Sequence, residues 1–351
     1  METTPTSICV LRLSAIGDCI NALALVQMLK RNFPQAEITW IIGKASVSLF
    51  EGIPGINFAV YDKKTGIRGM LALRKQLRNK TFDVVLDIQS ALRASILSLI
   101  AVKGRIKYGF DQERAMDGQR FFTNREVKSP EPPHIHVLDG FIAFAAALGC
   151  SDLVPRWDFC LTSAEISRMK GYITGKTVLL TPCSSKEFKN WTLNGYIEIS
   201  KYALSCGFNV IIAGGKSPYE QEMANNIING IHVDRERVTN LMGKTSLRDL
   251  AALISQVSLV ISPDSGPVHI ANALNIPVLG LYANHNPARV GPYSFGKYAV
   301  SVYEKYLVEE HPKGTQGLKW RTKVQNKFAM HGITTVMVRE KFDKILTDFK
   351  L

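Results

Sequence analysis

Short apolar runs alternate with helix-spaced segments along most of the chain, and this alternation restricts its possible folds more than any other feature. Strand-length runs separated by helices predict βαβ units around a parallel sheet. The alternation comes in two series, with a break near residues 150–175. Because 351 residues are long for one hydrophobic core, we expect two domains. The sequence therefore predicts an α/β protein with two doubly wound parallel sheets, whose ligand site lies in a cleft at the carboxyl ends of the strands.

The expected domains are residues 1–165, residues 175–325, and a basic amphipathic helix within residues 326–351 that packs back on the body. The expected strands are residues 8–13, 37–42, 57–61, 83–87, 178–181, 209–213, 238–241, 259–262 and 277–281. The expected helices are residues 18–31, 69–78, 91–102, 137–148, 193–205, 218–228 and 246–255. Residues 108–133 are rich in charge, glycine and proline and are expected to form a loop.

Composition narrows the class of protein. No apolar run approaches the ~20 residues needed to cross a bilayer, and the start METTPTSICVLRL lacks the features of a signal peptide. Six cysteines are scattered without a C-x-x-C pair, which favours a reducing cytoplasm. His134 and His136 form an H-x-H with no Cys, Asp or Glu cluster beside it, so we expect no metal site there.

The formal charge of +13 is unevenly distributed. Residues 61–130 hold 15 Lys and Arg against 7 Asp and Glu, a net charge of +8. Such a field favours an anionic partner: a nucleic acid, an acidic membrane surface or a phosphorylated substrate. A solvated basic surface is the alternative. Since the basic residues lack interleaved aromatics and no nucleic-acid-binding motif is present, we expect no nucleic-acid partner.

Polar residues follow four of the expected strands. In LRLSAIGDCINAL (residues 11–23), Ser14 and Gly17 form a turn and Asp18 opens a helix. Asp18 is either a helix-capping carboxylate or a general base that projects into the cleft. In LLTPCSSKEFKNW (residues 179–191), Ser184 and Ser185 precede two lysines, a combination suited to phosphate or to a plain polar loop.

The other two strand ends carry glycines and acids. AGGKSPYEQE (residues 213–222) allows close backbone approach of a ligand, with Glu220 or Glu222 available for ribose hydroxyls. In VISPDSGPVHIANAL (residues 260–274), Asp264 precedes a helix start whose free N–H groups suit a diphosphate. His269 is either a ligand contact or a packing histidine. The motifs G-x-G-x-x-G at the first strand and G-x-x-x-x-G-K-[ST] are absent, which disfavours a dinucleotide or P-loop site.

Together with LMGKTSLRDLAALI (residues 241–254), these motifs resemble glycosyltransferase family 9, the ADP-heptose:lipopolysaccharide heptosyltransferases. The resemblance runs through residues 11–293. The chain is similar in particular to enzymes that add the first heptose to Kdo. It implies a GT-B architecture and inverting, metal-independent transfer without a cofactor. The implied donor is ADP-L-glycero-D-manno-heptose, and the implied acceptor is a Kdo-lipid A type molecule in the inner leaflet of the cytoplasmic membrane. A cytoplasmic protein, peripheral on that membrane, is expected.

The resemblance also assigns roles. It implies Asp18 as general base and Lys189 on the diphosphate. The remaining donor contacts that it implies are Ser184, Ser185, Glu220 (or Glu222), Thr245, Asp264, Ser265, Gly266 and His269. Our candidates for acceptor contacts are Ser14, Gly17, Arg93 and Arg120. The basic helical stretch at residues 66–80 either rests on the membrane surface or simply packs on its domain.

Two segments depart from the family pattern. ANHNPAR (residues 283–289) replaces the usual T-x-P loop, and the basic tail after Tyr303 has no motif to align. The alternatives are a family member with another acceptor, as in heptose II or III transfer, and another nucleotide-sugar enzyme on the same fold, such as an epimerase.

Overall fold

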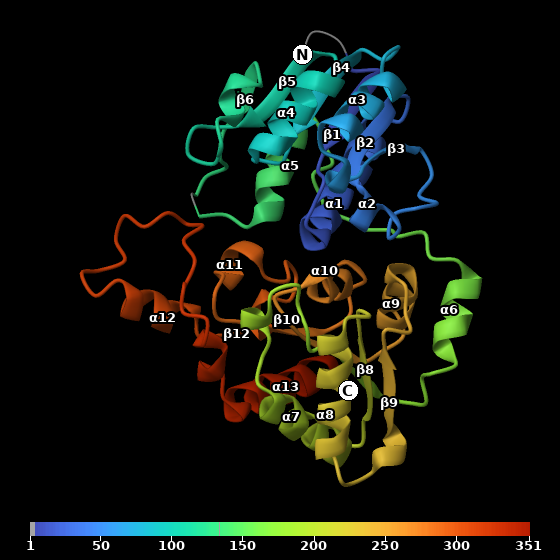
Figure 1. Ribbon diagram of the computed structural model, residues 1–351, viewed down its shortest axis with the longest axis vertical. Coiled ribbons are helices and arrows are strands. Elements are labelled where there is room, and N and C mark those ends of the chain that lie inside the picture. Colours follow the sequence, from blue (N-terminus) through green and yellow to red (C-terminus); the bar gives the residue numbers. More distant parts are fainter. Residues whose placement is uncertain (1–3, 133) are drawn as a thin grey trace. The chain divides into compact units, whose positions relative to one another are not determined.

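The computed structural model describes residues 4–132 and 134–351 and contains two compact units, one ending at Cys160 and the other beginning at Leu161 (Figure 1). Each unit is built on a six-stranded parallel sheet with flanking helices. The prediction of two doubly wound α/β units is therefore confirmed.

The first sheet has the strand order β3-β2-β1-β4-β5-β6. Its strands are β1 Ser7–Leu11, β2 Glu37–Gly43, β3 Ile56–Tyr61, β4 Phe82–Asp87, β5 Gly104–Phe110 and β6 Arg125–Val127. The helices are α1 Ile16–Asn32, α2 Lys44–Val47, α3 Gly66–Gln76, α4 Leu92–Ala101 and α5 Val137–Ala147, with a 3₁₀ turn at Gln119–Phe121.

Helices bury both faces of this sheet, as a parallel sheet requires. Leu11 of β1 and Val85 of β4 share one apolar cluster with Leu73 of α3 and Leu97 of α4. Helices α3 and α4 contact each other, and α1 contacts α5. The apolar stripes of α3 and α4 therefore hold these two helices as neighbours on one face (Figure 1).

The second sheet has the strand order β12-β11-β10-β7-β8-β9. Its strands are β7 Thr177–Leu180, β8 Asn209–Gly214, β9 Val238–Met242, β10 Leu259–Pro263, β11 Val278–Tyr282 and β12 Val300–Ser301. The helices are α6 Ser163–Lys170, α7 Leu193–Ser205, α8 Pro218–Gly230, α9 Leu247–Ile254, α10 Gly266–Ala273, α11 Pro287–Val290, α12 Tyr303–Glu310 and α13 Thr335–Phe349.

The last helix, α13, packs within the second unit. The ring of Phe342 lies edge-on to Tyr202 and Phe208, at centroid distances of 5.6 and 5.8 Å. The Tyr202 hydroxyl donates to Asp343 at 2.7 Å. The amphipathic pattern of the C-terminal residues thus becomes an apolar face against α7 and against Phe208, which directly precedes β8.

The expectation that residues 108–133 form a loop is wrong in part. Strand β5 continues to Phe110 and β6 lies within the segment, whereas Pro133 is outside the described residues. The charged residues of β5 suggested a loop. In the structure the strand tolerates the charge of Lys107, because its ammonium donates to the carbonyls of Ser98 (3.2 Å) and Val102 (2.8 Å).

Both sheets reverse their strand order at a single position. In the first unit this occurs between β1 and β4, and in the second between β7 and β10. Open α/β sheets bind ligands in the crevice outside the carboxyl ends of such a strand pair. The loops that follow β1, β4, β7 and β10 are therefore the places to look for a site.

Candidate functional site

The loop after β1 presents a paired carboxylate. Asp18 is the third residue of α1, and its Oδ2 accepts a hydrogen bond from the amide of Ala15 at 3.3 Å. The same oxygen forms an ion pair with Arg12, which donates in turn to the carbonyl of Ile88 at 2.7 Å. The side chain of Asp18 is 33% exposed, against 13% for Arg12. The carboxylate is thus fixed in orientation and still reaches solvent.

The two interpretations of Asp18 are compatible in this geometry. Its carboxylate lies in the first turn of α1, where the free N–H groups and the helix dipole stabilise negative charge. Its exposure leaves it accessible to a reactant. Of the other residues predicted in this turn, Ser14 is exposed and Gly17 is buried. Arg12 was missed by sequence analysis, although an arginine directly after a buried strand was a signal.

The loop after β4 adds a buried acid. Asp87 is 1% exposed, and burial raises its pKa to about 7, opposed by the Gln89 amide that donates to Oδ1 at 3.3 Å. Among the described residues, its Oδ2 has no hydrogen-bond partner. The side chain of Gln89 accepts from the Leu13 amide at 2.6 Å and so ties this loop to the loop after β1. Sequence analysis missed both residues, although a carboxylate that ends an apolar strand was a signal.

The segments that carry Arg93 and Arg120 reach this same edge. Gln119 donates to the carbonyl of Asp87 at 2.9 Å, which anchors the 3₁₀ turn that contains Arg120. Both arginines are exposed. Arg120 forms an ion pair with Glu126 at 3.7 Å rather than with Asp18.

The second unit contains a denser cluster at its strand reversal. A single oxygen of Asp264, Oδ2, lies 2.7 Å from Lys189 Nζ and 2.6 Å from His285 Nδ1. The exposed fractions are 13% for Asp264, 17% for Lys189 and 23% for His285. Burial alone would raise the pKa of Asp264, but its hydrogen bond with His285 and the charge of Lys189 hold that pKa well below its usual range.

His285 is a residue that sequence analysis missed. It belongs to residues 283–289, the segment that departs from the family pattern. The side-chain amide of Asn284 donates to the carbonyls of Val324 (3.2 Å) and Asn326 (2.9 Å). The tail after Tyr303, which sequence analysis left without a role, therefore holds the loop that presents His285.

The serine pair lies in the loop after β7. The amide of Ser184 donates to Asn190 Oδ1 at 2.7 Å, and its hydroxyl donates to the carbonyl of Lys186 at 2.8 Å. Ser185 is exposed. The Ser184 hydroxyl already donates within the loop, whereas Ser185 is exposed and therefore accessible to a ligand.

The geometry separates the two candidate acids after β8. Glu220 folds back on its own loop, where Oε1 accepts from the Gly215 amide at 2.9 Å and Oε2 from the Ser217 hydroxyl at 2.7 Å. A Cβ atom at Gly215 would collide with this carboxylate. Glu222 is exposed further along α8. The turn that leads to Thr245 joins the same loop, because the Gly243 amide donates to the Gly214 carbonyl at 3.2 Å.

Helix α10 starts two residues after Asp264. Ser265 precedes its first residue, Gly266, and the Ser265 hydroxyl lies 2.9 Å from the Ser262 hydroxyl. His269 is half-buried in the first turn. Free amides at a helix start favour an anion. The structure therefore brings Lys189, His285 and these amides to one end of the second sheet.

The H-x-H sequence has a structural role at one of its two histidines. His136 Nδ1 accepts from the Leu138 amide at 3.1 Å and so caps α5. Across residues 4–132 and 134–351, no three His, Cys, Asp or Glu side chains form a group that would hold a metal ion. No helix in these same ranges combines the length and apolarity needed to cross a bilayer.

Comparison with known proteins identifies the family. Residues 70–317 match the sequence profile of glycosyltransferase family 9 (heptosyltransferase). The chain is 43% identical over 343 residues, 97% of both chains, to the lipopolysaccharide core heptosyltransferase OpsX of Haemophilus influenzae.

Solved structures share the fold. The family 9 glycosyltransferase of Veillonella parvula has a TM-score of 0.78 at 20% identity, covering 99% of both chains. The E. coli heptosyltransferase WaaC with ADP has a TM-score of 0.73 at 18% identity, covering 97% of this chain and 99% of that one. The chain has the two-domain α/β architecture of the GT-B type and belongs to glycosyltransferase family 9, the heptosyltransferases.

Proposed function

We propose that this glycosyltransferase moves L-glycero-D-manno-heptose from ADP-heptose to the Kdo of the lipopolysaccharide inner core, with inversion and without a bound metal. The observation that carries the proposal is the 43% identity, over 97% of both chains, to a lipopolysaccharide core heptosyltransferase. This similarity supports heptosyl transfer in the assembly of the lipopolysaccharide core. We further propose that the donor is ADP-heptose and the acceptor is Kdo.

The donor's diphosphate would bind at the Lys189–Asp264–His285 cluster. Lys189 lies beside the first amides of α10, so a diphosphate there would meet an ammonium group and helix N–H donors together. His285 would act as a positioning residue, because its hydrogen bond to Asp264 would hold that carboxylate in place if Lys189 turned toward phosphate. The Ser185 hydroxyl is a further donor for the diphosphate, whereas the Ser184 hydroxyl, which donates to the Lys186 carbonyl, would have to turn from that carbonyl to reach it.

The nucleoside would lie along the loop after β8. The Glu220 carboxylate lies at the end of β8, where it accepts from the Gly215 amide, whereas Glu222 is exposed further along α8, so we assign Glu220 rather than Glu222 to the ribose hydroxyls. Thr245, from the adjoining turn, would face the adenine side. Ser265, Gly266 and His269 complete the donor contacts at the start of α10.

Asp18 would act as general base. As the acceptor hydroxyl oxygen attacks the anomeric carbon, Asp18 takes its proton, and the bond from that carbon to the diphosphate oxygen breaks with its electron pair. ADP then carries the charge that Lys189 and the α10 amides stabilise. A positioned base contributes typically 10²–10⁴-fold, which is about 3–5 kcal/mol of the barrier. Arg12 orients the carboxylate, and Ser14, Gly17, Arg93 and Arg120 are the acceptor-side candidates.

The test is ADP release from ADP-heptose, with and without a Kdo-lipid A acceptor, for wild type and Asp18→Ala. We expect release that requires the acceptor and falls at least about a hundredfold in the variant, with donor binding retained. Asp139→Asn is the matched control, since Asp139 is also the third residue of a first-unit helix and accepts from that helix's N-cap amide. Release without acceptor would favour the epimerase-like alternative. Release only with a heptose-bearing acceptor would favour heptose II or III transfer.

A further inference from the structure

Helices α3 and α4 carry basic residues and no acidic ones. Their sequences, GIRGMLALRKQ and LRASILSLIA, contain four cations and no Asp or Glu. The two helices contact each other and share one apolar cluster beneath them. These two neighbouring helices therefore carry positive charge that no acidic residue of their own offsets.

Apolar side chains point outward among these cations. Ile67 and Leu71 of α3 are 63% and 51% exposed, and Leu99 of α4 is 65% exposed. Ile67, Leu71 and Arg74 follow one another at spacings of four and three residues, so they share one stripe of the helix, opposite the buried Leu73. A stripe of exposed leucine and isoleucine beside cations is typical of an interfacial helix.

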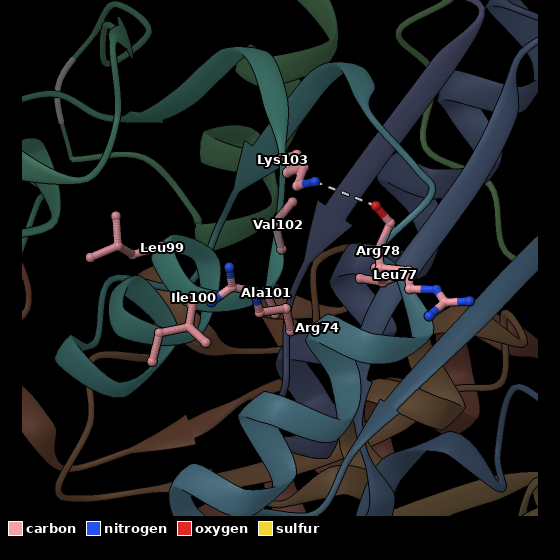
Figure 2. Close-up of a pocket in the computed structure, with 8 residues that line it drawn as sticks. All are labelled: Arg74, Leu77, Arg78, Leu99, Ile100, Ala101, Val102 and Lys103. Atoms are coloured by element: carbon pink, nitrogen blue, oxygen red, sulfur yellow. Dashed lines mark hydrogen bonds between the residues drawn. The ribbon is translucent and has the colours of Figure 1, made fainter.

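The stripe leads to a pocket of about 160 Å³ between the C-terminal ends of α3 and α4 (Figure 2). Leu77, Leu99, Ile100, Ala101 and Val102 supply its apolar lining, and three cations complete it: Arg74, Arg78 and Lys103. Figure 2 shows the Lys103 ammonium directed at the Arg78 carbonyl, 3.4 Å away. In the described part of the chain, no carboxylate forms an ion pair with any of the three cations. We call the following set the basic face: Ile67, Leu71, Arg74, Arg78, Leu99 and Lys103.

We propose that the basic face docks the enzyme on a membrane rich in anionic phospholipid. A lipid phosphate would lie among the three cations of the pocket, and the exposed apolar side chains would enter the acyl boundary of the bilayer. The charges are complementary, and the apolar stripe matches a lipid surface better than a free phosphate ion. This inference deepens the proposed function, since an acceptor embedded in a bilayer requires the enzyme to work at its surface.

The probe is a vesicle, and neither donor nor acceptor is needed. Co-sedimentation is measured with vesicles of phosphatidylcholine alone and of phosphatidylcholine mixed with phosphatidylglycerol. We expect binding to the anionic vesicles only, weakened by salt. Arg74→Gln/Arg78→Gln/Lys103→Gln should lower the partition coefficient roughly a hundredfold, because each cation near an anionic surface contributes about fivefold. Ile67→Ser/Leu71→Ser/Leu99→Ser should also weaken binding, with the melting temperature of each variant checked first.

The matched control removes three exposed cations of the second unit, Lys170→Gln/Lys176→Gln/Lys313→Gln, for the same change in net charge. Equal loss of binding in this control, or equal binding to both kinds of vesicle, would overturn the proposal. Displacement by soluble glycerol phosphate at millimolar concentration would identify a free-anion site and overturn it as well. Vesicle binding without any heptosyl transfer would leave this inference standing and the proposed function wrong.

Once heptosyl transfer has been demonstrated, the rate of transfer on a soluble and on a vesicle-bound acceptor gives a second test. The triple cation variant should keep its rate on a water-soluble acceptor fragment and lose rate on the same acceptor held in vesicles. Equal loss on both acceptors would place the effect in the reaction itself and contradict a docking role.

Discussion

The two units share one strand order, but the acids at their strand reversals are exposed to different degrees. After β1, the acid is the more open partner: Asp18 is 33% exposed and Arg12 13%. After β10, the acid is the more covered partner: Asp264 is 13% exposed, beneath Lys189 at 17% and His285 at 23%. The first site offers a carboxylate to a ligand, whereas the second offers nitrogen donors, among them the Lys189 ammonium.

This difference shows that the chemistry is set by the loops, not by the sheet. The same topology places an ion pair at the carboxyl end of each sheet. An exposed carboxylate suits removal of a proton from a hydroxyl, and exposed nitrogen donors suit a diphosphate. On this account the first unit supplies the base and the second unit holds the donor.

The largest effect that we expect in the second unit follows loss of Lys189. Lys189→Ala should lower kcat/KM by about 10²–10³-fold, because a charged donor to the leaving group is removed. Lys186→Ala is the control, since this lysine is exposed in the same loop. Steady-state kinetics measures both variants. Equal losses would mean that the loop's general charge matters and the contact with Asp264 does not.

The buried acid of the first unit should make stability depend on pH. The pKa of Asp87 is about 7 in the folded chain, and an unfolded aspartate titrates near 4. Between these values the folded chain binds more protons, so the free energy of unfolding falls as pH rises through this window. Asp87→Asn should remove this dependence and stabilise the protein above pH ~7 by on the order of a few kcal/mol. Urea unfolding across pH 4–8 tests this, and parallel curves for the two proteins would contradict it.

His285→Asn should raise the KM for the donor about tenfold, the cost of one charge-assisted hydrogen bond. His285 and Lys189 together lower the pKa of Asp264, so the variant's Asp264 should protonate at a higher pH. The acidic limb of the pH–rate profile should then move upward. His232→Asn, at an exposed histidine, should leave the profile in place. An unchanged profile in His285→Asn would remove this residue from the site.

The smallest effect that we expect is on ADP affinity, through the contact with the ribose. Glu220→Gln should weaken ADP binding severalfold, as expected for one lost hydrogen bond, and Glu222→Gln should not. Ser217→Ala removes the same helix cap while leaving the carboxylate, so it isolates the structural part of the change. Calorimetric titration with ADP compares all three. A stronger effect from Glu222→Gln would reverse our assignment.

Sequence reasoning found the acids and lysines that follow strands, because a strand end is visible in local spacing. Asp18 and Asp264 were singled out in this way, whereas the family resemblance selected Lys189 from the two lysines that follow β7. Which of these residues pair was not foreseen, because Lys189 and Asp264 are 75 residues apart and His285 reaches Asp264 from a loop 21 residues further on. Which loops meet depends on strand order, which spacing does not reveal. Strands β5 and β6 were missed for another reason: their charged residues are typical of a loop, although in the fold Lys107 of β5 and Arg125 of β6 donate to neighbouring backbone carbonyls.

The division of roles between the units is tested most directly by measuring ADP affinity and single-turnover heptosyl transfer in two variants side by side. We predict that Asp18→Asn retains wild-type ADP affinity and transfers at least about a hundredfold more slowly. Lys189→Ala should lose ADP affinity as well as rate. Loss of ADP affinity in Asp18→Asn, or transfer at the wild-type rate in that variant, would contradict the account.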